Sequence, residues 1–235
     1  MKKIIFCSAV VLVGVVLASI VNKANAAVIY SNDFESAVGS EWSNTSTDIT
    51  PADNRRFLGQ FSGDDAVSLS LNNLSVHNFV TLSFDLYVIQ SWDGVGLDWG
   101  PDVWQLSVNN GPVLVNTTFS NTGQDEHSQS YPGPYSGSQL YPAYTGAAQV
   151  NTLGYDFYGD SVYSLSFIFE HCDSSLSLNF AAFGLQGICD ESWGLDNINV
   201  ALGLGTFDIP EPASLTIFAI SGLCFLIRRT HSGCC

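Results

Sequence analysis

The stretch Phe79–Gln90 constrains the fold more than any other part of the chain, because its polarity alternates residue by residue. Apolar side chains occupy every second position: Val80, Leu82, Phe84, Leu86 and Val88. In a β-strand successive side chains point to opposite faces, so a period of two places the apolar set on one face. The stretch therefore predicts a long strand with one face in a core and the other toward solvent.

Similar alternation recurs along the chain, with glycine, asparagine and aspartate between the segments. The clearest repeats cover residues 67–71, 163–169, 176–180 and 198–202, and shorter strand candidates cover 28–30, 57–61, 103–108 and 112–119. Asn109-Asn110-Gly111 separates the last two and predicts a hairpin turn. No window in this region has a helical period. Many short antiparallel strands predict an all-β fold, an antiparallel β-sandwich of jelly-roll type.

The N-terminal residues have the pattern of an export signal. Lys2 and Lys3 precede an apolar core over 4–20, and Ala24-Asn25-Ala26 places small residues at the −3 and −1 positions. This pattern predicts a signal peptide cleaved after Ala26. A permanent N-terminal helix is the alternative. We expect one exported domain over residues 27–208, which is long enough to bury a sizeable core.

The C-terminal residues predict a second membrane-active segment. Pro210, Glu211 and Pro212 precede an uncharged apolar run over 213–227, and Arg228 and Arg229 follow it. The prolines end the folded domain. A helix over the run would be roughly 22 Å long against about 30 Å of hydrocarbon core, so it bridges a membrane only with its flanks. The arginines are expected on the cytoplasmic side.

This tripartite tail resembles the PEP-CTERM sorting signal of exopolysaccharide-producing Gram-negative bacteria. The resemblance implies that an exosortase cleaves near Pro210–Pro212 and releases the protein to the cell surface or beyond it, where such proteins associate with exopolysaccharide. The chain departs from the pattern by continuing over residues 230–235. An ordinary C-terminal membrane anchor is the alternative.

The charge of the expected domain is strongly negative. The chain has 22 Asp and Glu against 7 Lys and Arg, and Arg55 and Arg56 are the only basic residues between the two terminal segments. Such a domain repels phosphate backbones, so we expect no nucleic-acid partner. The acidity either keeps the protein soluble or binds a hard cation such as calcium.

A glycine-rich segment directly after the strongest strand contains the first candidate site. Asp93, Asp98 and Asp102 are expected to coordinate calcium together with backbone carbonyls, because the intervening glycines permit sharp turns. Trp92 and Trp99 are expected to offer flat apolar faces to a sugar ring. The alternative places the tryptophans in the core and makes the aspartates turn formers.

A second candidate calcium site joins the two ends of the domain. The segments around Asp33 and Glu35 and around Asp196 resemble those of jelly-roll carbohydrate-binding modules. The resemblance implies that these three carboxylates hold one structural calcium.

A long segment over 121–149 is rich in glycine, proline, serine and tyrosine, and it predicts an irregular loop. Tyr131 and Tyr135 are expected to form part of a surface that binds sugars or protein. The alternative is that the tyrosines pack onto the sandwich.

Two cysteines, Cys172 and Cys189, lie within the expected exported domain away from its ends. In an oxidising compartment such a pair predicts a disulfide. A metal or redox pair is the alternative, although the spacing matches no zinc motif.

No catalytic motif is present. The sequence lacks Gly-x-Ser-x-Gly and His-Glu-x-x-His, and His77, His127 and His171 are scattered. We therefore expect a secreted, non-catalytic surface or matrix protein associated with exopolysaccharide. The alternative function is a calcium-dependent carbohydrate-binding module, and a third is an enzyme that cleaves polysaccharide or protein.

Overall fold

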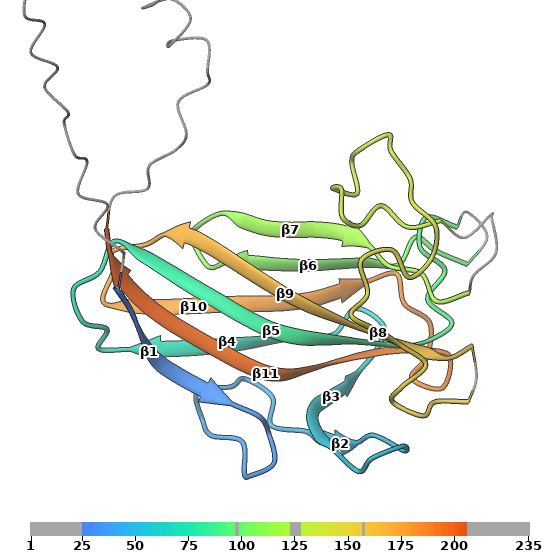
Figure 1. The fold of residues 1–235 in the computed structure, drawn as a ribbon, viewed down its shortest axis with the longest axis horizontal. Helices are drawn as coiled ribbons and strands as arrows, with labels where there is room; N and C mark the ends of the chain where they lie inside the picture. Colours follow the sequence, from blue (N-terminus) through green and yellow to red (C-terminus); the bar gives the residue numbers. More distant parts are fainter. Residues whose placement is uncertain (1–24, 97–98, 123–127, 157, 206–235) are drawn as a thin grey trace, which may run out of the picture.

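A computed structural model describes residues 25–96, 99–122, 128–156 and 158–205 (Figure 1). The expected signal peptide, apart from its last two residues, and the expected sorting residues Pro210, Glu211, Pro212, Arg228 and Arg229 lie outside these ranges. Within the described residues, no helix has the length and apolar character needed to cross a membrane.

The described residues form eleven β-strands. In chain order they are β1 (Asn25–Asn32), β2 (Thr47–Ile49), β3 (Arg56–Phe61), β4 (Ala66–Asn72), β5 (Phe79–Gln90), β6 (Val103–Val108), β7 (Val113–Thr118), β8 (Gln149–Val150), β9 (Asp160–Glu170), β10 (Ser175–Phe183) and β11 (Glu191–Leu204). The long alternating strand has the predicted bounds, and the β6–β7 hairpin turns at the predicted Asn-Asn-Gly. The short edge strands β2 and β8 were not predicted, because three and two residues are too few to show a period.

Two antiparallel sheets form the sandwich (Figure 1). One sheet has the order β2-β3-β11-β5-β9-β8, with β1 also paired to β11, and the other has the order β4-β10-β6-β7. The chain changes sheet at most of its connections, as in a jelly roll. The predicted all-β class and the sandwich architecture are confirmed.

Strand β5 lies at the centre of the larger sheet, between β11 and β9. Its apolar face packs against the smaller sheet through aromatic contacts. The Phe84 ring lies 5.9 Å from Trp104 and 5.4 Å from Phe180, measured between ring centroids. Edge and tilted ring contacts of this kind add stability beyond the burial of their area.

The outer face of β5 is not solvated along its whole length. A second apolar cluster forms there from Phe57, Tyr87, Ile89, Leu153 and Val162. The alternation predicted that Tyr87 faces solvent, but Tyr87 is 2% exposed. The chain around Leu153 covers this end of the sheet, a long-range contact that local periodicity does not contain.

The two ends of the described chain lie together at one end of the sandwich, on the left in Figure 1. Asn25 at the start of β1 pairs with Leu204 at the end of β11, and Ala26 pairs with Gly203. The expected cleavage point after Ala26 therefore falls within strand β1, which would keep its pairing from Ala27 onward.

The expected disulfide between Cys172 and Cys189 is wrong, because both are free and exposed. Cys172 follows Glu170, which pairs with Phe79, and Cys189 precedes Glu191, which pairs with Gln90. Phe79 and Gln90 are the two ends of β5, so roughly 35 Å separates the cysteines at about 3.3 Å per residue. A disulfide requires Cα atoms within about 7 Å.

The packing of β5 predicts a large difference between two substitutions. Leu82 is fully buried between Val200 of β11 and Phe167 of β9, whereas Ile168 on β9 is 60% exposed. Leu82→Ala should lower the free energy of unfolding by about 2–5 kcal/mol, because it leaves a cavity. Ile168→Ala should change it by less than about 0.5 kcal/mol. Chemical denaturation measures both, and equal losses would contradict the assigned faces.

Candidate functional site

Three buried carboxylates meet at the end of the sandwich opposite the chain termini. Asp93 follows β5, Asp102 precedes β6, and Glu191 begins β11. One oxygen from each lies within 4.8 Å of the others. We call these three residues the carboxylate cluster. Asp102 and Glu191 are fully buried, and Asp93 is 8% exposed.

A tight turn brings Asp93 and Asp102 together. Gly94 adopts a φ of +65°, and a side chain there would meet the Ser128 carbonyl, with Cβ only 2.3 Å from its oxygen. The Gly94 carbonyl accepts a hydrogen bond from the Asp102 amide at 2.9 Å. The Asp93 amide in turn donates to the Asp102 carboxylate Oδ2. Glycine is required at this point because other residues resist this conformation at such close backbone contact.

Glu191 joins the cluster from the neighbouring strand, where it pairs with Gln90. Its Oε2 accepts a hydrogen bond from the Gln186 amide at 2.6 Å. Three buried oxygens at this end have no hydrogen-bond partner among the described residues: Gln90 Oε1, Asp102 Oδ1 and Glu191 Oε1. Buried polar atoms are normally paired, so the carboxylate oxygens need either a cation or a proton shared between Asp102 and Glu191, whose side chains are close enough to hydrogen-bond.

Within the part of the chain that the structure describes, no lysine or arginine side chain supplies that positive partner. The described residues contain only two arginines and no lysine. Arg55 binds Asp196, with Nη2 2.5 Å from Oδ2, and Arg56 donates to Thr47. Carboxylate and amide oxygens are the ligands that calcium prefers. The cluster therefore has the donor atoms for a hard divalent cation.

The electrostatics of the cluster agree with this assignment. Burial, and then repulsion by Glu191, raises the pKa of Asp102 to about 9. Burial also raises the pKa of Glu191 to about 7, with Asp93 and Asp190 adding to the rise. Buried carboxylates without a counter-charge hold protons at neutral pH. A bound cation would replace those protons as the neutralising charge.

A shallow pocket of about 340 Å³ opens beside the cluster. It is lined by Ser91, Asp93, Trp99, Thr122, Tyr158, Gln186 and Asp190. Asp93 belongs to both the cluster and the pocket wall. Trp99 is 66% exposed and Tyr158 is 53% exposed, so two aromatic rings stand at the surface around this opening.

The apolar surface continues beyond the pocket. A neighbouring hollow shares Tyr158 and Asp190 with the first and adds Ile188, which is 47% exposed. Large apolar side chains gathered on the surface of a soluble domain often mark a binding site. The two hollows together present an aromatic and aliphatic surface with an acidic wall.

The structure brings together part of the first predicted site. Asp93 and Asp102 meet as expected, Trp99 is exposed as expected, and Asp98 lies outside the described residues. Trp92 as a ligand platform is wrong, because it is fully buried and its indole Nε1 donates to the Ser192 carbonyl at 2.8 Å. The alternative prediction, that Trp92 packs in the core of the sandwich, is confirmed.

The two predicted tyrosines do not join Trp99. Tyr131 is partly buried and packs against the core, with its ring centroid 5.0 Å from that of Phe119 and 5.3 Å from that of Tyr163, as the packing alternative expects. Tyr135 is 39% exposed, but its amide donates to the Asn116 carbonyl, which places it along β7.

The second predicted calcium site is wrong. Asp196 is fully buried and accepts from Arg55 and from the Tyr87 hydroxyl, the latter at 2.7 Å. Glu35 is exposed and accepts from the Arg56 amide, and Asp33 is also exposed. Among the described residues, only Asp93, Asp102 and Glu191 lie close enough together to share a metal ion through three ligands. Arg55 neutralises the charge of Asp196, and no metal ion is needed there.

Sequence reasoning missed Glu191 and Tyr158. Glu191 lies 89 positions after Asp102, and only the pairing of β11 with β5 brings the two together. No local spacing contains that information. Tyr158 follows the long loop and had no motif around it.

The cluster predicts a calcium-dependent stability that one substitution removes. At a calcium concentration 100-fold above Kd, binding should stabilise the protein by about 2.7 kcal/mol, or roughly 5–10 °C in Tm. Glu191→Gln should abolish the response without lowering the Tm in chelator, because it removes a buried charge. Glu170→Gln, at the opposite end, should keep the response. Thermal denaturation measures all three proteins, and an equal calcium response in Glu191→Gln would contradict the site.

Comparison with known proteins leaves the family open. No protein-family model matches the chain, and no curated protein is similar to it in sequence. Solved structures with a loosely similar arrangement include the C-terminal CBM6 of a laminarinase from Zobellia galactanivorans (10% identity, 73% of this chain and 97% of that chain, TM-score 0.36). They also include the CBM22-1 xylan-binding domain of Xyn10C from Paenibacillus barcinonensis (14% identity, 77% of this chain and 97% of that chain, TM-score 0.37). A third is the CBM6cm-2 module of Cellvibrio mixtus lichenase 5A in complex with cellotriose (13% identity, 74% of this chain and 97% of that chain, TM-score 0.35). These overlaps are too loose to assign a family or a ligand.

Proposed function

We propose that this protein is a non-catalytic, calcium-dependent carbohydrate-binding module that binds neutral glycans at the pocket beside the carboxylate cluster. One observation carries the proposal: a buried cluster suited to calcium lies directly against a pocket with exposed aromatic rings, and Asp93 belongs to both. Calcium would hold the pocket residues in place, because the cluster joins the connections that form the pocket.

The aromatic rings favour a sugar as the ligand. Trp99 and Tyr158 are both more than half exposed at the pocket rim. A flat aromatic face buries the C–H face of a sugar ring, while a few polar groups fix its hydroxyls. Ser91, Thr122 and Gln186 supply such polar groups in the same pocket.

The charge of the pocket favours neutral sugars over acidic ones. Asp93 and Asp190 line it, and no lysine or arginine is among its lining residues. Four carboxylates lie at or beneath the pocket when Asp102 and Glu191 are included, and one divalent ion neutralises only two of them. The remaining negative charge repels uronates and sulfated sugars.

The buried acids fit a metal site better than a hydrolytic pair. A glycosidase acid must contact the glycosidic oxygen, and its partner must reach the sugar from another side. Asp102 and Glu191 are fully buried and their oxygens lie within 4.8 Å, so a substrate in the pocket touches neither. This arrangement supports binding without cleavage.

Replacing Trp99 should abolish glycan binding while the calcium site stays intact. Trp99→Ala removes the main apolar face of the pocket, so retention on neutral polysaccharides in calcium should fall at least tenfold by affinity electrophoresis. Tyr135→Ala, which removes an exposed aromatic ring in the loop beside β7, is the matched control and should bind normally. Glycan retention that is unchanged in Trp99→Ala, or in chelator, would contradict the proposed binding mode.

We further propose that the module acts at the cell surface or in the extracellular matrix, in association with exopolysaccharide. The support lies in the two terminal segments, with an export signal before Ala27 and a Pro-Glu-Pro tail resembling an exosortase substrate. A module that binds neutral glycans is suited to that location.

Mass spectrometry of the secreted protein should find an N-terminus at Ala27 and a C-terminus near Pro210–Ala213, because both terminal segments are removed. The same measurement on cells lacking the processing enzyme should find the longer chain in the membrane fraction. Secreted protein that still contains Cys235 would contradict processing at the tail.

A further inference from the structure

Two histidines far apart in the sequence meet at the termini end of the sandwich. His77 lies before β5 and is 4% exposed, and His171 follows β9. His77 Nε2 lies 2.7 Å from His171 Nδ1. The ring planes differ by 15° and the centroids are 5.0 Å apart, so the imidazoles meet through their facing nitrogens.

The outer nitrogen of His77 fixes its tautomer. His77 Nδ1 lies 2.6 Å from the Ser75 carbonyl oxygen, which can only accept a hydrogen bond. Nδ1 therefore carries the proton, and the neutral ring directs the Nε2 lone pair at His171. The backbone of Ser175 is a hydrogen-bond partner of the His171 ring. Both imidazoles therefore have a main-chain partner in addition to each other.

This arrangement is typical of histidines that bind metal. A metal-binding histidine usually donates its second N–H to a carbonyl or carboxylate, which orients the ring and its free lone pair. In the neutral pair a single proton lies between the facing nitrogens, donated by His171 Nδ1 to His77 Nε2, and a metal ion could replace that proton. Zn–N bonds of about 2.0–2.1 Å in tetrahedral geometry require facing nitrogens roughly 3.4 Å apart, a small opening of the present contact.

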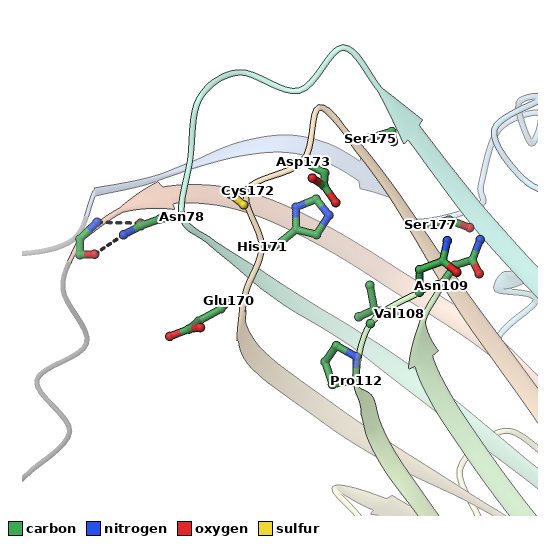
Figure 2. A pocket seen from close by; sticks show the side chains of 13 residues that line it. Asn78, Val108, Asn109, Pro112, Glu170, His171, Cys172, Asp173, Ser175 and Ser177 are labelled. Atoms are coloured by element: carbon green, nitrogen blue, oxygen red, sulfur yellow. Dashed lines mark hydrogen bonds between the residues drawn. The ribbon is translucent and has the colours of Figure 1, made fainter.

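We propose that His77 and His171 form a binding site for a borderline divalent transition ion of the Zn²⁺ type. Cys172 and Asp173 follow His171 on the same exposed loop, but neither has a ligand atom within 4.8 Å of both histidines, so the site has two protein ligands in this structure. Figure 2 shows His171 and Asp173 on this loop, at the wall of a groove of about 770 Å³. The groove wall includes Glu170 and Asp173 and no lysine or arginine, which favours a cation.

The ion would stabilise the structure around Gly205, where the described chain ends. The side chain of Asn78, next to His77, makes two hydrogen bonds with the backbone of Gly205, drawn as dashed lines in Figure 2. The His171 amide donates to the Asn78 carbonyl at 3.3 Å. Joining the two histidines therefore ties the β4–β5 and β9–β10 connections together beside the exit of the chain.

This site is chemically and spatially separate from the carboxylate cluster. Imidazole nitrogens select transition ions, whereas the cluster offers oxygens suited to calcium. The two sites lie at opposite ends of β5, so the inference does not depend on the proposed glycan binding.

Zinc titration of the purified protein in saturating calcium tests the site. Isothermal titration calorimetry should show one Zn²⁺ per chain, and His171→Gln should weaken that binding at least 100-fold. His127→Gln, a histidine elsewhere in the chain, should leave it unchanged. Because His171 lies at the surface, the variant is expected to fold, and circular dichroism checks that it does.

The ligand type provides a second readout that does not depend on a variant. Electron paramagnetic resonance of the Cu²⁺-loaded protein should show coupling to two imidazole nitrogens. Zinc binding that is equal in the wild type and His171→Gln, or a copper spectrum with oxygen ligands only, would overturn the proposal.

Discussion

The neutralisation of buried negative charge is the interaction on which this structure depends. Three carboxylates converge where the chain crosses between the sheets, and the described residues offer two arginines in total. One arginine neutralises Asp196 on the outer side of the larger sheet. A buried carboxylate is costly unless a proton or a positive charge neutralises it, so the converging acids at the cluster need one or the other. A calcium ion would supply that charge, as proposed above, because the two backbone amides that donate to Asp102 and Glu191 carry no net charge.

The two ends of the sandwich have different chemistry. The pocket end carries oxygen ligands and exposed aromatic rings, and the termini end carries the histidine pair and both ends of the described chain. If the proposed sorting tail held the protein at the envelope, the pocket would lie at the end of the sandwich opposite the point where the described chain ends. A glycan would then be reached before the chain is released.

The sequence predicted the fold better than the site. Alternation defines β5 and the neighbouring strands because burial of one face is a local pattern, and Asn109-Asn110-Gly111 defines a hairpin because turn geometry is local. Asp93, Asp102 and Trp99 were identified because they follow a strong strand in a glycine-rich turn. Glu191 could not be identified, since it reaches the cluster only through the pairing of β11 with β5. Trp92 and Trp99 have similar surroundings in the sequence, and only the packed sandwich shows which of them is buried. The same limit explains why the disulfide prediction was wrong. Cys172 and Cys189 are close in the sequence, but they lie near opposite ends of β5.

A crystal structure of the protein grown with calcium, with anomalous diffraction recorded at long wavelength, tests the central claim most directly. The expected result is an anomalous peak with carboxylate oxygens of Asp93, Asp102 and Glu191 at about 2.3–2.6 Å from it. Carboxylates that hydrogen-bond to one another in protonated form, with no peak between them at saturating calcium, would contradict the account.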